Sequence, residues 1–168
     1  MSTLITTTAQ IGTIKDAGGN NTAMTIDSSG RVTLPQRVAF QGKKGDTHTL
    51  SANTSTNITF NLTDLSHAAW NGTTFTAPVA GLYRLFINGH KQTADGNPME
   101  LAIYVNGSAI ETAYVLGNTN VRPRASADSL TVLAVNDAVT FRILQGDVYA
   151  GSSAAVSSNL MCSGYLIG

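Results

Sequence analysis

Short segments in which apolar and polar residues alternate recur along the chain, and this recurrence most constrains the fold. Val139-Thr140-Phe141-Arg142-Ile143 is a clear example. Such alternation gives a strand one apolar face. No segment of helical length shows a 3.6-residue period, and 63–70 is the only candidate for a short helix or turn. Strands are expected near 36–42, 47–51, 57–62, 73–77, 81–90, 99–106, 109–116, 127–135, 138–148 and 159–167.

The breaks between these segments contain residues that are typical of turns. Asn106-Gly107 joins two alternating runs and is a strong two-residue hairpin signal, because both residues tolerate positive φ. Asn136-Asp137 separates another pair of runs in the same way. Many short strands joined by tight turns predict an all-β sandwich or jelly roll of about ten strands.

Composition excludes several classes of partner. Only 12% of residues are charged, against about 25% in typical soluble domains. The formal net charge is zero, which predicts no binding to nucleic acid and no attraction to an anionic membrane. No apolar stretch approaches the roughly 18 residues of a membrane span, and the first residues lack a signal-peptide pattern.

Two motifs indicate which known fold family this sequence resembles. Phe75, Gly81 and Tyr83 stand at the spacing Phe-x5-Gly-x-Tyr, and Ser163-Gly164-Tyr165-Leu166 lies near the end of the sequence. Together with Asn106-Gly107, they resemble the globular domain of the C1q and tumour-necrosis-factor group. The resemblance spans about residues 36–168, although Ser66 departs from its pattern.

This resemblance implies an antiparallel jelly roll that forms a homotrimer, binds other molecules and catalyses no reaction. The residues expected to form the fold and its core are Phe75, Gly81, Tyr83, Leu101, Ile103, Leu130, Val132, Phe141, Ile143, Gly164 and Tyr165. A fold with so few charges also needs somewhere to bury its remaining apolar face, which agrees with a threefold contact.

Residues 1–35 form a separate segment. A polar leader covers 1–22, and Met24, Ile26, Val32 and Leu34 then alternate with polar residues around the turn sequence Asp-Ser-Ser-Gly. A two-stranded hairpin alone is marginal in water, so we expect a partner to hold it. The sequence 26–35 also resembles segments that precede β-structured tips in bacteriophage tail and fibre proteins. The domains expected are therefore an anchor, 1–35, and a jelly-roll head, 36–168.

The candidate chemical groups form no recognisable active site. His48, His67 and His90 have no metal-ligand spacing, and the single cysteine, Cys162, fits a small buried apolar side chain better than a reactive thiol. We therefore expect no catalytic residue and no cofactor.

Two groups of loop residues have a possible binding role. Asp95, Asn97 and Glu100 could hold calcium through oxygen ligands, although Asp and Asn are also common in turns. Arg122 and Arg124 flank Pro123 in a loop that could meet a carboxylate or an acidic glycan, and a simple solvated loop is the alternative.

These observations favour a non-enzymatic bacteriophage structural protein on the virion exterior. In the first interpretation it is a short homotrimeric tail fibre or tip. Its residues 1–35 bind other virion proteins, and its head binds a host surface glycan or protein, or a neighbouring virion protein. A second interpretation keeps the fold and makes the protein a capsid or collar decoration protein. A third, a glycan-active enzyme on a β scaffold, needs paired carboxylates, which this sequence offers poorly.

Overall fold

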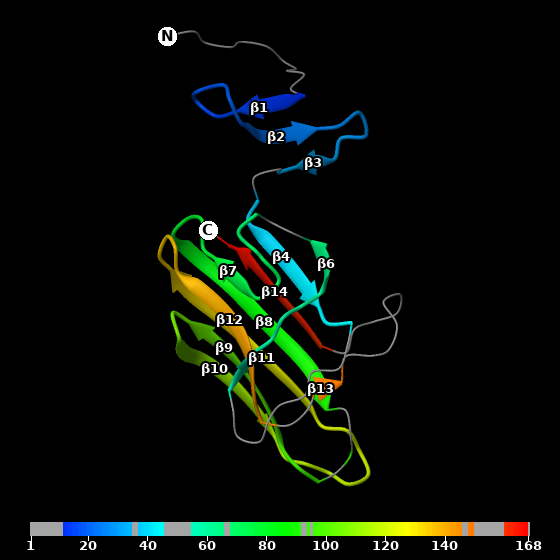
Figure 1. The fold of residues 1–168 in the computed structure, drawn as a ribbon. Helices are drawn as coiled ribbons and strands as arrows, with labels where there is room; N and C mark the ends of the chain where they lie inside the picture. Colours follow the sequence, from blue (N-terminus) through cyan, green and yellow to red (C-terminus); the bar gives the residue numbers. More distant parts are fainter. Residues whose placement is uncertain are drawn as a thin grey trace. The chain divides into compact units, whose positions relative to one another are not determined.

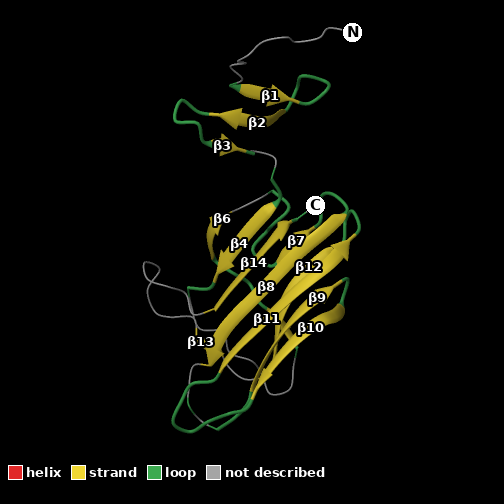
Figure 2. Cartoon of the chain, turned by 180° about the vertical axis from the view of Figure 1, so that it is seen from behind, coloured by secondary structure: helices red, strands yellow, loops and turns green. Residues whose placement is uncertain are grey.

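The computed structural model describes residues 12–34, 37–45, 55–65, 68–91, 94, 96–145, 148–149 and 160–167, all as strands, turns or connecting segments. Figure 2 shows strands and loops throughout these ranges and no helix. The chain divides into two compact units, 1–37 and 38–168.

The larger unit is an antiparallel jelly roll made of two sheets (Figure 1). One sheet has the order β11-β8-β14-β4-β6, and β13 pairs with β8. The other has the order β10-β9-β12-β5, and β7 pairs with β12. The strands are β4 (Ala39–Lys43), β5 (Thr56–Asn57), β6 (Leu62–Leu65), β7 (Thr74–Thr76), β8 (Gly81–Lys91), β9 (Met99–Val105), β10 (Ser108–Val115), β11 (Arg124–Leu133), β12 (Ala138–Gln145), β13 (Val148–Tyr149) and β14 (Leu160–Leu166).

Most expected strands agree with these elements to within three residues. The short helix or turn expected at 63–70 is confirmed only in part, because Ala68–Ala69 form a turn but β6 occupies 62–65. The strand expected at 57–62 is wrong in part, because β5 ends at Asn57 in one sheet and the chain then crosses to the other sheet, where β6 begins at Leu62. The strand expected at 47–51 lies outside the described residues.

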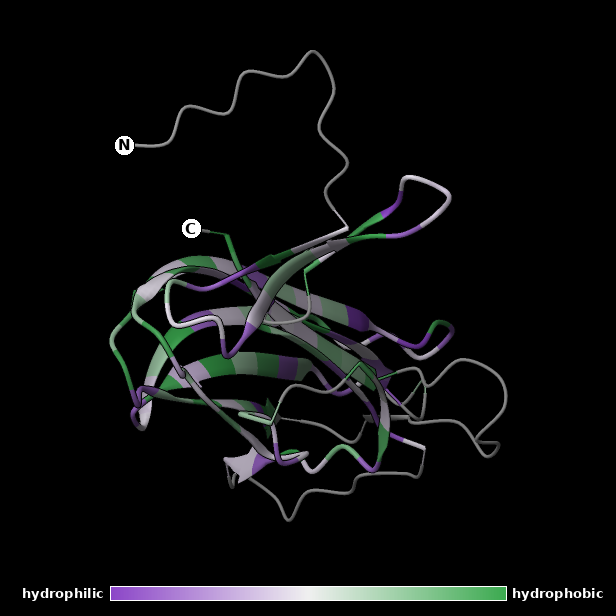
Figure 3. Ribbon diagram, turned by 90° about the horizontal axis from the view of Figure 1, so that it is seen from above, coloured by the Kyte–Doolittle hydropathy of each residue, from purple (hydrophilic) through white to green (hydrophobic). Residues whose placement is uncertain are grey.

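The core lies between the two sheets and contains an aromatic stack. The Phe40 ring lies 4.7 Å from Trp70 and 4.6 Å from Phe75, measured between ring centroids. Tyr83 packs beside Phe75, and its hydroxyl donates a 2.8 Å hydrogen bond to the Val79 carbonyl. This bond fixes the turn that leads into β8. Figure 3 shows polar and apolar bands that alternate along the strands, as expected for strands with one buried face.

Six of the residues expected in the core have fully buried side chains: Phe75, Tyr83, Leu101, Ile103, Phe141 and Ile143. The expectation for Leu130 and Val132 is wrong, because these residues are 64% and 75% exposed. Tyr165 is not a core residue either, because it is only half-buried and lies opposite the exposed Arg84. On β11 the inward positions are Ala125, Ala127 and Leu133. Strand β11 lies close to β9 and β10 of the opposite sheet, where small inward side chains fit.

The smaller unit contains a three-stranded sheet of β1 (Thr13–Lys15), β2 (Thr22–Ile26) and β3 (Val32–Thr33). The expected hairpin is present as β2 and β3. Asp27 forms its turn, because its Oδ1 accepts hydrogen bonds from the Ser29 and Arg31 amides at 2.8 and 3.0 Å. Strand β1 corrects the expectation that residues 1–22 are only a polar leader.

Candidate interaction surface

The outward side of the sheet that contains β11 is the strongest candidate for a binding surface in the described part of the chain. We call it the outer face. Alternation along each strand places every second residue there, and the register aligns these residues across the sheet. Leu130 lies opposite Arg84, which lies opposite Tyr165, and Val132 lies opposite Leu82. The outer face comprises Ala39, Gln41, Lys43, Leu65, Leu82, Arg84, Phe86, Asn88, His90, Arg124, Ser126, Asp128, Leu130, Val132, Met161, Ser163, Tyr165 and the adjoining Ile167.

One end of the outer face is apolar. Val132 and Leu130 are largely exposed there, and Leu82 is half-buried beside them. Ile167, 51% exposed, extends this group, because its amide donates to the Leu82 carbonyl over 2.8 Å. Contiguous exposed apolar side chains on a folded domain mark sites of protein association more often than scattered ones do.

An ion pair lies beside this apolar end. Arg84 Nε donates to Asp128 Oδ1 at 3.0 Å, and a terminal guanidinium nitrogen donates to Oδ2 at 2.5 Å. This two-point geometry raises the pKa of Arg84 and lowers the pKa of Asp128, so both groups stay charged at neutral pH. Arg84, Phe86, Ser163 and Tyr165 line a shallow hollow of about 190 Å³ next to the pair. The outer face therefore offers apolar area, a fixed charge pair and a depression.

The sequence itself contained a signal for this surface. Arg84 must face away from the core on a strand whose inward residues are Tyr83, Leu85 and Ile87. Asp128 is charged and shares its alternation phase with Leu130 and Val132. A charged residue in phase with two apolar residues indicates that all three point outward.

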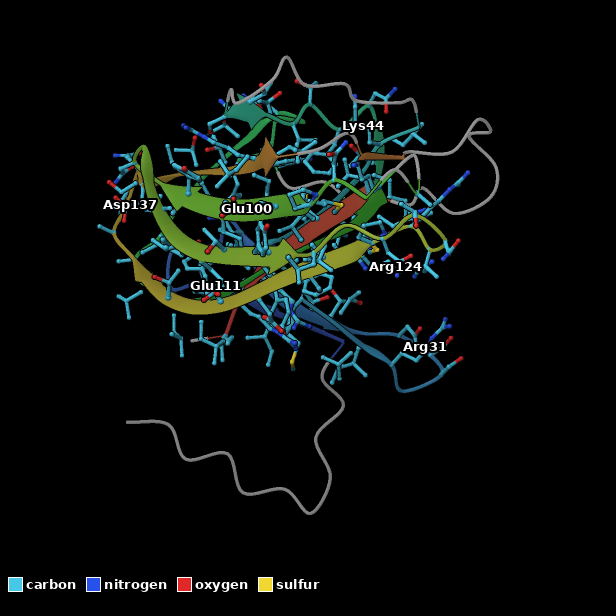
Figure 4. All side chains as sticks on the ribbon, turned by 90° about the horizontal axis from the view of Figure 1, so that it is seen from below. Arg31, Lys44, Glu100, Glu111, Arg124 and Asp137 are labelled. Carbon is cyan, nitrogen blue, oxygen red and sulfur yellow. The ribbon has the colours of Figure 1, made fainter. Side chains whose placement is uncertain are left out.

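Arg124 begins β11 and lies on the outer face opposite His90, whereas Arg122 is exposed in the preceding segment. Pro123 between them is buried, and its carbonyl accepts a hydrogen bond from the Lys91 amide at 2.9 Å. Arg124 and Asp137 stand at opposite ends of the jelly roll (Figure 4). The two arginines thus flank the anchored Pro123, at the other end of β11 from Val132.

The residues considered for calcium do not form a described ligand set. Asp95 lies outside the described residues, and Asn97 is exposed. The Asn97 carbonyl accepts a hydrogen bond from the buried Lys91 ammonium at 3.1 Å, so one loop oxygen already holds a cation. Within the described ranges no three His, Cys, Asp or Glu side chains come together as a metal site would require.

The residues considered for catalysis are not brought together either. His48 and His67 lie outside the described residues, and His90 is half-buried on the outer face. Cys162 is fully buried between the sheets, and this burial raises the pKa of its thiol well above the usual value. Across the described part of the chain, no helix is long and apolar enough to cross a membrane.

Comparison with solved structures defines the fold class. The globular domain of zebrafish complement 1qA aligns with a TM-score of 0.60 and 17% identity, covering 79% of this chain and 98% of that domain. Murine APRIL aligns with a TM-score of 0.60 and 9% identity, covering 79% of this chain and all of that one. A TNF from S. frugiperda, Eiger, aligns with a TM-score of 0.51 and 7% identity, covering 79% of this chain and 93% of that one.

The jelly roll is therefore a C1q/TNF-like fold, as the sequence motifs predict. At these identities the likeness shows the fold alone. No protein-family model matches the sequence, and no curated protein matches it.

Proposed function

We propose that the protein is a non-enzymatic binding protein that works as a homotrimer, with the outer face buried between its three copies. The observation that carries this proposal is the exposure of Leu130 and Val132 beside Leu82 and Ile167. Burial of apolar surface stabilises association by about 25 cal/mol per Å². The resemblance to the C1q and tumour-necrosis-factor group implies the threefold arrangement.

The ion pair is compatible with the proposed interface. Arg84 and Asp128 neutralise each other within one chain, so their approach to a sister copy leaves no unpaired charge. Sedimentation equilibrium tests the proposal. Wild type should sediment as a trimer, and the double variant Leu130→Arg/Val132→Arg as a monomer, because six added charges would enter the trimer interface.

A matched control separates this effect from general damage. Leu116 and Val121 are exposed to a similar degree, 74% and 62%, but lie on the segment between β10 and β11. Leu116→Arg/Val121→Arg should remain trimeric. Cooperative melting of both double variants shows that the head stays folded. A monomeric wild type, or a trimer that survives the Leu130/Val132 change, refutes the proposal.

We further propose that the protein belongs to a bacteriophage virion exterior, as a short tail fibre or tip attached through residues 1–35. The likeness of 26–35 to segments of phage tail and fibre proteins supports this, as does the separate amino-terminal unit. Removal of residues 1–35 should leave a soluble head that melts cooperatively and no longer enters virions. Normal incorporation of the shortened protein, or a head that fails to fold, contradicts this division. Cross-linking to capsid proteins in place of tail proteins would instead indicate a decoration protein.

A further inference from the structure

The amino-terminal sheet is apolar on one face only. Met24 and Ile26 of β2 point to this face, and their cross-strand partners Ile14 and Val32 point with them. Leu34, two residues beyond Val32, continues the row. Ile14, Val32 and Leu34 are 41%, 56% and 51% exposed. We call these five residues the apolar stripe.

The opposite face of this sheet is a row of threonines. Thr13 pairs with Thr25, and Thr25 pairs with Thr33. The charged groups of the sheet lie near or within its turns: Lys15 and Asp16 before the first, and Asp27 and Arg31 around the second, where they form an ion pair. The unit's remaining charged residue, Arg37, follows the sheet, and its amide donates to the Leu34 carbonyl at 3.0 Å. The apolar stripe itself contains no charge, so two identical stripes can meet without like-charge repulsion.

A three-stranded sheet of this size has no second layer within its own unit as described. Small sheets become stable when an apolar face packs against another layer. A surface made only of Ile, Met, Val and Leu is best matched by another surface of the same kind. A charged partner surface would lose hydration against the stripe without gaining a counter-charge.

The short segment between the amino-terminal sheet and the head determines which other apolar surface the stripe can reach most easily. Only a few residues separate Leu34 from Val38, where the jelly-roll unit begins. If three heads associate, three copies of the apolar stripe are tethered within a short distance. Tethering by a short linker raises the effective concentration to about the millimolar range. Weak apolar contacts that would not form between free sheets then form between sister chains.

We infer that the apolar stripe packs against the same stripe of the other copies, so that the amino-terminal sheets form a second self-association site and a stalk for the trimer. This inference rests on the proposed trimeric head. It leaves the threonine face as the surface through which the protein would meet the particle.

Pyrene labelling of the full chain tests the inference. Val32→Cys places a label on the apolar stripe, and Thr33→Cys places one on the opposite face of the same strand. Both are made in a Cys162→Ala background, so that one thiol is present. The stripe label should give strong excimer emission, because copies touch there, and the Thr33 label should give little. Leu34→Cys should behave like Val32→Cys, which guards against a local defect at one position.

Sedimentation of the same labelled proteins separates the two hypotheses. A trimer whose excimer emission is confined to positions 32 and 34 supports the inference. A trimer without excimer emission at these positions, or with equal emission at position 33, overturns it and leaves the trimeric head standing. A monomer overturns the trimeric head and the stalk together.

Discussion

Asn106 and Asp137 join two hairpin turns at one end of the jelly roll. Asn106 Nδ2 donates a 2.7 Å hydrogen bond to Asp137 Oδ1, and Asn106 Oδ1 accepts one from the Ala138 amide at 2.9 Å. Asn106 directly follows β9 and has a φ of 50°, whereas Asp137 directly precedes β12. One side chain thus ties the turn between β9 and β10 to the turn between β11 and β12.

Replacement of Asn106 separates its two roles. Asn106→Ala should lower the free energy of unfolding by about 1–2 kcal/mol, because it removes the hydrogen bonds and puts a side chain that disfavours positive φ in the turn. Asn106→Gly should cost less, because glycine accepts this φ and loses only the hydrogen bonds. Urea unfolding of the two variants measures the difference. Equal stability of wild type and Asn106→Ala would contradict this account.

Asp137 should contribute to the acid sensitivity of the fold. Hydrogen bonds from the Asn106 side chain and the Ala134 amide lower the pKa of Asp137 below its usual range. A lowered folded-state pKa gives stability that is present above the unfolded value and is lost as the pH falls through the folded value. In Asp137→Asn, the free energy of unfolding should therefore decrease less steeply than in wild type as the pH is lowered below about pH 4.

The slope of unfolding free energy against pH is the measurement that checks this prediction. Glu111→Gln, at an exposed carboxylate on β10 (Figure 4), is the control. Asp16, Asp27 and Asp128 also have lowered pKa values, so some acid dependence should persist. An unchanged slope in Asp137→Asn speaks against the prediction.

Gly164 is required because an aromatic ring covers it. A Cβ at this position would lie 2.5 Å from Phe40 Cε1 and 3.0 Å from Leu85 Cδ2. Phe40 cannot easily move, because it is stacked between Trp70 and Phe75. Gly164→Ala should lower the free energy of unfolding by about 1–3 kcal/mol through overpacking. Thermal melting would show this loss, whereas Ser108→Ala, at an exposed strand end, should melt like wild type.

Cys162 should be inert in the folded protein. Its side chain is fully buried, and the raised pKa keeps the thiol protonated at neutral pH. Ellman's reagent should therefore react with Cys162 only after denaturant is added, at a rate limited by unfolding. A fast reaction in native buffer would show that the β14 region opens readily.

The positions of most strands could be predicted from the sequence, because alternation and turn residues act locally. Asn106-Gly107 forms its turn wherever the flanking runs are extended, and Phe75, Gly81 and Tyr83 have the same local roles that their spacing indicates. A short amino-terminal strand such as β1 was missed, because three residues are too few to display a period.

The tertiary structure decided which of the two faces of β11 is buried. Alternation shows that Leu130 and Val132 share a face, and the charge of Asp128 in the same phase favours that face as the outward one, but only packing against the opposite sheet fixes which face is buried. Close approach of β11 to β9 and β10 favours small inward residues, so Ala125 and Ala127 are buried and the larger Leu130 and Val132 point outward. The apolar end of the outer face follows from this orientation of β11. The sequence alone determines the period of a strand, whereas the space between packed layers determines which side of it meets solvent or a partner.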